Sequence, residues 1–219
     1  MSDPIWNLPN IITLGRILIT PVIALLPFIE GYWPKLITLG VFLVAAVSDV
    51  VDGRLARQRN LVTDLGKLLD PIADKLLLFS TIIPIYWISR QRQHLYDIPV
   101  WGSIPLWVCI LLLGRELAMT ALRWWASRRG VVISAQGPGK LKTVMQNIFI
   151  GGTIAWFAFR DAWGPLGLGK TEWGHYWNQF HGGFVAVTLA IAAVLTVYSF
   201  MIYLYRYRRL FREGLGLGD

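Results

Sequence analysis

Four aspartates in the first third of the chain have the residue type and spacing that could bind divalent cations. Asp49 and Asp52 are three residues apart, Asp70 and Asp74 are four apart, and strongly apolar runs lie on both sides. Because each helical residue turns by about 100°, each pair would share one face of a helix. A hairpin of two such helices would aim all four carboxylates into one cleft.

Energetics favour a metal site over a structural role for these acids. An aspartate at the centre of a bilayer costs about 2.5–3.5 kcal/mol, so four would cost about 10–14 kcal/mol. That is comparable with the roughly 5–15 kcal/mol that stabilises a whole domain. Oxygen ligands alone suit Mg²⁺ or Mn²⁺ better than zinc. The alternative is a polar hairpin at the membrane edge, with solvated acids.

The pattern around these acids resembles the signature of the CDP-alcohol phosphotransferases. It reads Asp49, then Asp52-Gly53-x-x-Ala56-Arg57, then Gly66-x-x-x-Asp70-x-x-x-Asp74. The resemblance implies that the four aspartates hold two divalent cations and that Asp74 is also the catalytic base. It further implies a set of contacts to a CDP-linked lipid donor, CDP-diacylglycerol: Asp49, Gly53, Ala56, Arg57, Thr63 and Gly66.

The start of the first apolar run carries three polar residues near one face. Asn10, Thr13 and Arg16 follow one another at intervals of three. Their structural interpretation is helix capping and snorkelling. The segment is also similar to the N-x-x-T-x-x-R opening of the same family, which implies that Asn10 and Thr13 contact the donor.

Two later segments carry cations suited to a phosphate. The first runs from Arg115-Glu116 to Arg123, and the second is Gly139-Lys140-Leu141-Lys142. Buried charges in a membrane span are functional candidates, and lysines at a helix N-terminus favour phosphate. The alternatives are an interhelical ion pair made with Glu116 and a plain basic loop.

Both segments resemble the glycerol phosphate-using branch of the family. The resemblance implies that Arg115, Arg123, Lys140 and Lys142 bind the acceptor's phosphate. One position departs from the pattern, because Gln136 stands where the family usually has serine. The acceptor contacts there stay open.

Composition predicts an all-α, polytopic membrane protein. The chain has 219 residues, is 55% hydrophobic, has eleven tryptophans and a mean hydropathy of +0.50. We expect a single catalytic domain, 1–219, with an interfacial segment at 1–9. The resemblance implies the CDP-alcohol phosphotransferase fold for it. Six apolar runs are long enough to cross a bilayer: 10–29, 34–57, 68–89, 99–126, 141–160 and 183–205.

The distribution of basic residues predicts the orientation. Lys and Arg concentrate between the second and third spans, between the fourth and fifth, and in the C-terminal tail. By the positive-inside rule, both termini and the acidic cleft should face the cytoplasm. The net charge of +8 indicates attraction to an anionic leaflet. No basic soluble domain is present that would bind nucleic acid.

Taken together, these features predict phosphatidyl transfer from CDP-diacylglycerol to the 1-hydroxyl of glycerol 3-phosphate in a bacterial inner membrane. Family resemblance also implies a homodimer. Within the family, inositol phosphate, serine or a second phospholipid are alternative acceptors. A divalent-cation transporter would spread its carboxylates over several spans, whereas these cluster on one hairpin. A purely structural protein would have to bear the cost of the buried acids.

Overall fold

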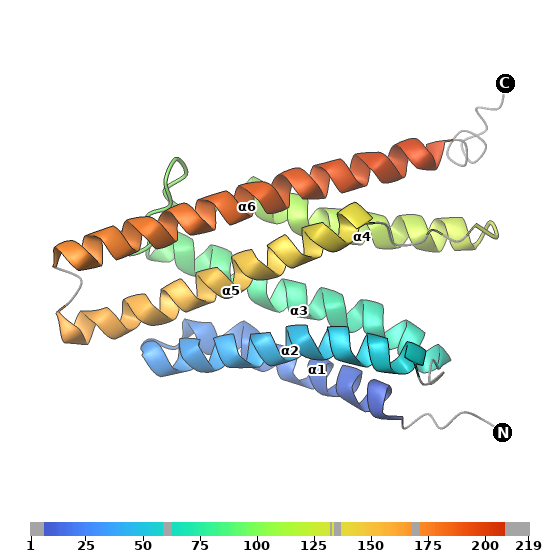
Figure 1. Cartoon of the computed structure of the whole chain (residues 1–219), viewed down its shortest axis with the longest axis horizontal. Helices are drawn as coiled ribbons and strands as arrows, with labels where there is room; N and C mark the ends of the chain where they lie inside the picture. Colours follow the sequence, from blue (N-terminus) through green and yellow to red (C-terminus); the bar gives the residue numbers. More distant parts are fainter. Residues whose placement is uncertain (1–6, 59–62, 132, 134–136, 168–170, 209–219) are drawn as a thin grey trace. The chain divides into compact units, whose positions relative to one another are not determined.

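In its described part the chain, seen in a computed structural model, folds into helices joined by turns and short connections. That part covers residues 7–58, 63–131, 133, 137–167 and 171–208, and it excludes the side chains of 50–58, 64, 67, 138, 164 and 165. Within it, six α-helices and one short 3₁₀ helix follow one another, with no strand (Figure 1). Their bounds are α1 Leu8–Leu25, η1 Leu26–Phe28, α2 Tyr32–Gln58, α3 Asp64–Gln91, α4 Leu106–Ser127, α5 Gly137–Leu166 and α6 Glu172–Arg206.

The helices divide into two compact units. The first comprises 1–104 and 150–185, and the second comprises 105–149 and 186–219. Helices α5 and α6 therefore contribute one part to each unit. The second unit has its own apolar cluster: Met119, Leu122, Ala126, Ile133 and Tyr203.

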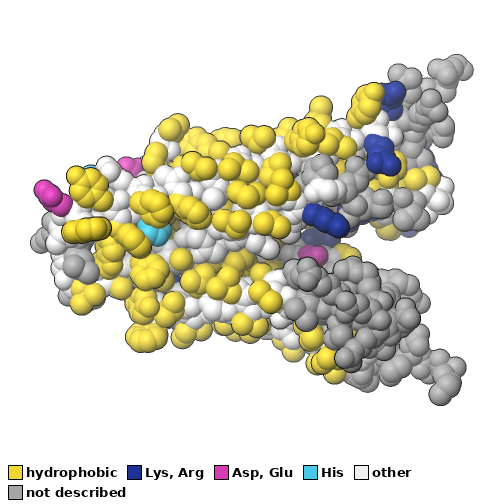
Figure 2. Space-filling view, in the orientation of Figure 1, with side chains coloured by type: hydrophobic (Ala, Val, Ile, Leu, Met, Phe, Trp, Pro, Cys, Tyr) yellow, Lys and Arg dark blue, Asp and Glu magenta, His cyan; other side chains and the backbone are white. Residues whose placement is uncertain are grey.

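Within the residues that the structure describes, three helical segments are long and apolar enough to cross a membrane: Leu8–Phe28, Tyr32–Asp49 and Glu172–Arg206. Their outward surfaces are apolar, as at Leu18 and Val194, which are 71% and 66% exposed. Figure 2 shows hydrophobic side chains over long stretches of helix surface. Such surface is unusual for a soluble protein and suits contact with lipid. The helices α3, α4 and α5, expected as further spans, carry charged residues among their apolar ones.

The helix ends differ most from the predicted spans at two places. Residues 99–105 precede α4 as a turn closed by the Ile98–Gly102 bridge, although the fourth span was expected to begin at 99. At the other place, α6 begins at Glu172, although the sixth span was expected to begin at 183. The residues 172–182 are too polar to be part of a predicted membrane span, but they are helical in the structure.

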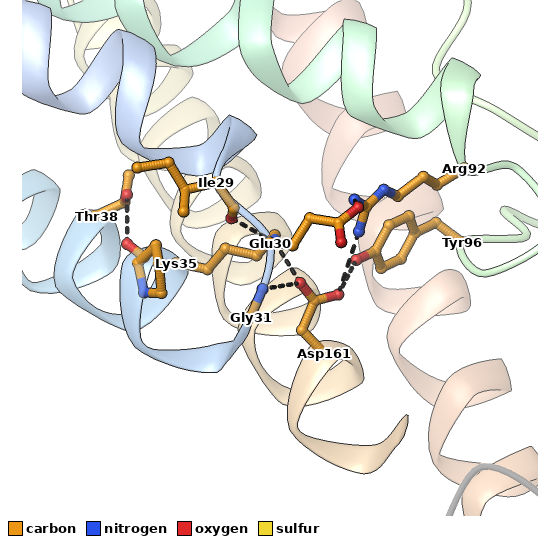
Figure 3. A network of polar contacts seen from close by, with 9 residues as sticks. Ile29, Glu30, Gly31, Lys35, Thr38, Arg92, Tyr96 and Asp161 are labelled. Atoms are coloured by element: carbon orange, nitrogen blue, oxygen red, sulfur yellow. Dashed lines mark hydrogen bonds and ion pairs between the residues drawn. The ribbon is translucent and has the colours of Figure 1, made fainter. Parts of the chain in front are cut away.

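In the first unit, a buried polar network centred on Asp161 joins the start of α2 to α5 (Figure 3). The Asp161 carboxylate is paired with Lys35, accepts from the Gly31 N–H at 3.1 Å and accepts from the Tyr96 hydroxyl at 3.1 Å. Gly31 has φ +109°, a backbone conformation that favours glycine. Arg92 lies 3.7 Å from the same carboxylate.

Candidate active site

The polar residues of α1 form a buried stripe that contacts α2 and α3. Asn10, Thr13 and Arg16 are 5%, 1% and 3% exposed. The helix itself begins with an Asn7 cap, whose side chain accepts from the Asn10 N–H at 2.9 Å. Asn7 provides the cap, and the side chains of Asn10, Thr13 and Arg16 contact residues of α2 and α3 and the N-cap residue of α3. The capping interpretation therefore fails for Asn10.

The first contact of the stripe joins Asn10 to the N-terminus of α3. The Asn10 Nδ2 donates to Thr63 Oγ1 at 2.9 Å, and Thr63 caps α3 by accepting from the Gly66 N–H at 3.1 Å. A Cβ added to Gly66 would lie 2.7 Å from Asn10 Oδ1. Only glycine allows α1 and α3 to approach so closely here. Three residues expected to bind the donor are thus brought together.

The next two contacts reach the aspartates. Thr13 Oγ1 donates to Asp70 Oδ1 at 2.9 Å. One turn later, the Arg16 guanidinium is ion-paired with Asp49, and its Nη1 lies 3.1 Å from Asp74 Oδ1. Carboxylates from α2 and α3 therefore converge on a single cation carried by α1.

Part of the expected site lies outside the described side chains. Asp52, Gly53, Ala56 and Arg57 all fall in α2, but only their place in the helix is described. Among the side chains that are described, no group of three acids, cysteines or histidines is close enough to hold a metal. The site's chemistry nevertheless fits a cation, because the Arg16 guanidinium already lies between Asp49 and Asp74.

A second polar cluster lies in the second unit and is centred on Glu116. Its Oε1 accepts from Arg115 Nη1 at 2.8 Å and from Lys142 Nζ at 2.6 Å. Arg115 Nη2 also donates to Ser199 Oγ at 3.2 Å. Lys142 is 2% exposed, so this cation is held deep in the unit. The interhelical ion pair considered as the structural alternative is present, between Glu116 and Lys142.

The remaining predicted acceptor residues lie apart from this cluster. Arg123 and Lys140 are exposed, and in the described part of the chain no hydrogen bond or ion pair joins either of them to Glu116. Gln136, where the sequence departs from the family pattern, lies outside the described residues. The structure thus brings together two of the four predicted cations.

Arg16 is the residue that sequence reasoning missed. A lone arginine near the start of an apolar helix is usually a snorkelling residue. Its spacing was the available signal, because it continues the three-residue interval from Asn10 and Thr13.

The chain belongs to the CDP-alcohol phosphatidyltransferase family, whose model matches residues 6–198. Among curated proteins, it is 38% identical over 150 residues to a probable phosphatidylglycerophosphate synthase of Mycobacterium tuberculosis. It is 32% identical over 152 residues to CDP-diacylglycerol–glycerol-3-phosphate 3-phosphatidyltransferase 2 of Arabidopsis thaliana. It is also 35% identical over 144 residues to a CMP-forming cardiolipin synthase of Oryza sativa subsp. japonica.

These matches cover two thirds of the chain and less of the relatives. The shares of this chain are 67%, 68% and 64%, and the shares of the relatives are 65%, 64% and 43%, in the same order. The family is therefore shown over most of the chain, and the particular acceptor is a separate question.

Proposed function

We propose that the chain transfers a phosphatidyl group from CDP-diacylglycerol to the 1-hydroxyl of sn-glycerol 3-phosphate, releasing phosphatidylglycerophosphate and CMP. The observation that carries this proposal is the convergence of Asp49, Asp70 and Asp74 on the polar stripe of α1. Family membership and the names of the relatives from Mycobacterium and Arabidopsis support it.

The donor side of the reaction is assigned to the first unit. Asn10 and Thr63 offer an amide and a hydroxyl at the N-terminus of α3, where backbone N–H groups favour an anion. Arg57 is suited to a pyrophosphate because its planar guanidinium can donate two parallel hydrogen bonds. Gly53 and Ala56 would let the donor approach the backbone, and Gly66 keeps Asn10 and Thr63 together at the N-terminus of α3.

Two divalent cations, Mg²⁺ or Mn²⁺, would be held by Asp49, Asp52, Asp70 and Asp74. Bound there, they would supply neutralisation of the pyrophosphate and of the charge that develops on departing CMP. Asp74 accepts the proton of the attacking 1-hydroxyl. The new bond joins that oxygen to the phosphorus bearing diacylglycerol, and the bond from this phosphorus to the CMP oxygen breaks.

The acceptor's phosphate is assigned to the cations of the second unit. In the structure Glu116 neutralises Arg115 and Lys142. A phosphate would compete with this carboxylate for the same donors. Arg123 and Lys140, which are exposed, would add attraction for an anion from solution.

For the whole chain, we propose six membrane spans in a bacterial inner membrane, with the acidic site on the cytoplasmic side. The three apolar segments found by length and composition support the membrane assignment. A homodimer is the expected assembly. With the site on the cytoplasmic side, CDP-diacylglycerol would enter from the cytoplasmic leaflet and glycerol 3-phosphate from the cytoplasm.

The test is CMP release by the purified protein from CDP-diacylglycerol with Mg²⁺ or Mn²⁺ and a panel of alcohols. Glycerol 3-phosphate should support release, and inositol phosphate and serine should not. The likeness to a cardiolipin synthase makes phosphatidylglycerol the second candidate acceptor. Release with phosphatidylglycerol but not with glycerol 3-phosphate would establish that candidate instead.

The role of Asp74 is tested by the Asp74→Asn variant. It should lose CMP release by at least about 100-fold, the range expected when a general base is removed. Binding of CDP-diacylglycerol, measured separately, should be retained. Substantial turnover in this variant would exclude Asp74 as the base.

A further inference from the structure

Two buried atoms in the second unit lack hydrogen-bond partners. Among the described residues, the carbonyl oxygen Oε1 of Gln146 meets no donor, and Nε of Arg115 meets no acceptor. Gln146 is 4% exposed. Most buried polar groups in proteins are paired, so each unpaired atom requires an explanation.

Gln146 belongs to the face of α5 that carries the Glu116 cluster. It follows Lys142 by four residues, which places both on one side of the helix. Gly139 lies one turn before Lys142, and a Cβ there would lie 3.9 Å from Arg115 Nη2. Gly139, Lys142 and Gln146 therefore lie along one face of α5, and this face meets the guanidinium of Arg115 at Gly139.

Two hydroxyl groups of helix α6 in this unit are already engaged. Ser199 Oγ donates to the Thr196 carbonyl at 3.1 Å, and Thr196 Oγ1 donates to the Ala192 carbonyl at 2.6 Å. Since these protons bond within α6, they do not serve Gln146. A ligand that enters the unit could supply the missing hydrogen-bond donor for Oε1.

The two unpaired atoms have opposite character. Arg115 Nε donates and suits an anionic oxygen, whereas Gln146 Oε1 accepts and suits a hydroxyl. A ligand that satisfies both carries a phosphate and a hydroxyl. Glycerol 3-phosphate has both groups, and its 1-hydroxyl is consumed as the nucleophile. The 2-hydroxyl is the donor that is left.

We propose that Gln146 selects the acceptor by accepting a hydrogen bond from the 2-hydroxyl of glycerol 3-phosphate. This inference rests on the proposed function and adds a specificity-determining residue to it. Discrimination by such a contact comes from leaving a buried polar group unpaired when the wrong acceptor binds. An alcohol that has the phosphate and the 1-hydroxyl but no 2-hydroxyl would therefore react less well.

The experiment compares glycerol 3-phosphate with 3-hydroxypropyl phosphate, which lacks only the 2-hydroxyl. CMP release gives kcat/KM for each, and their ratio within one preparation is independent of how much protein is folded. We expect the native protein to prefer glycerol 3-phosphate by about 5–10-fold, as for one hydrogen bond. The Gln146→Met variant, which keeps the length and removes the carbonyl, should bring the ratio to about 1.

Two further variants complete the test. Gln91→Met, at an exposed glutamine of α3, should keep the native ratio. Gln146→Glu retains an acceptor oxygen and should keep a preference for glycerol 3-phosphate, even if the added charge lowers both rates. An unchanged ratio in Gln146→Met, or a native ratio near 1, would overturn the role of Gln146 alone. No CMP release with either acceptor would overturn the proposed function as well.

Discussion

At the scale of single residues, Arg16 is the side chain on which the acidic site depends when metal is absent. It is 3% exposed and holds Asp49 and Asp74 together. Both aspartates are partly exposed, so solvent screens part of the attraction. The arginine nevertheless supplies a positive charge to two acids that would otherwise repel each other.

Replacing this arginine should make the fold depend on metal. We expect Arg16→Met to lower the melting temperature of the metal-free protein by several degrees, corresponding to about 1–3 kcal/mol. Mn²⁺ should restore most of the loss, because it replaces the missing positive charge. Thermal unfolding with and without Mn²⁺ measures both effects. Arg90→Met, at an exposed arginine of α3, is the control, and equal behaviour of the two variants would contradict the prediction.

Gly66 offers a second test at this scale. In Gly66→Ala, the new Cβ would lie 2.7 Å from Asn10 Oδ1, so α1 and α3 must separate or the Asn10–Thr63 bond must break. We expect lower stability by about 1–3 kcal/mol, as for overpacking, and weaker binding of CDP-diacylglycerol. Gly15→Ala is the matched control in α1, because its Cβ would meet nothing within 4 Å. If both variants bind the donor as the native chain does, the close approach has no functional role.

At the scale of elements, the aspartate spacing predicted that α2 and α3 each carry acids on one face, and the three-residue interval predicted that Asn10 and Thr13 share a face. The acids of the two helices meet on Arg16 of α1, which packs against both α2 and α3. Other features could not be predicted. The Lys35–Asp161 pair joins residues 126 positions apart. In the sequence, each of these charges alone would be interpreted as an interfacial residue. The unpaired state of Gln146 depends on packing, which spacing does not reveal. The start of α6 was missed because its polar first turns resemble a loop.

The Asp161 network connects the beginning of α2, the end of α5 and the segment after α3. Burial by itself raises the pKa of Asp161, but the hydrogen bond and charge of Lys35, with the Gly31 N–H and the Tyr96 hydroxyl, lower it below the ordinary value. The same carboxylate, together with burial, raises the pKa of the Tyr96 hydroxyl. The network is therefore assembled around an ionised aspartate.

The direction of this shift predicts how stability depends on pH. A carboxyl whose pKa is lowered by folding stabilises the protein at pH values above the pKa of the unfolded chain, which is 3.8 for aspartate. This stabilisation is lost as the pH falls through the lower pKa of the folded protein. Asp161→Asn should be less stable by about 3–5 kcal/mol near neutral pH, because it leaves Lys35 buried without its partner charge. It should also lose less stability on acidification. Unfolding between pH 7 and pH 3 measures both.

A control in the same unit separates this effect from general acid denaturation. Asp97 is exposed, and Asp97→Asn should follow the native pH profile. Parallel profiles of Asp161→Asn and the native protein would show that Asp161 is not the group responsible.

At the scale of the whole molecule, the proposed orientation follows from the charges near the membrane. On the face shown in Figure 2, Lys and Arg side chains of the second unit gather at the end where α6 finishes. Arg206 and Arg208 lie at this end. The positive-inside rule assigns it to the cytoplasm.

Cysteine labelling tests this orientation. Cys109 is buried, and Cys109→Ala gives a background without thiols. In right-side-out vesicles, a membrane-impermeant maleimide should label Glu172→Cys directly and Arg206→Cys only after permeabilisation. Labelling of both variants from the same side would contradict a spanning α6.

The length of α6 has a consequence for the lipid around it. Its 35 residues make a rod of about 52 Å, whereas the hydrocarbon layer measures about 30 Å. The rings of Trp177, Phe180 and His181 contact one another near the polar beginning of this rod, where amphipathic rings suit the headgroup level. The helix would therefore still span a thicker bilayer. In a thinner bilayer the helix would tilt.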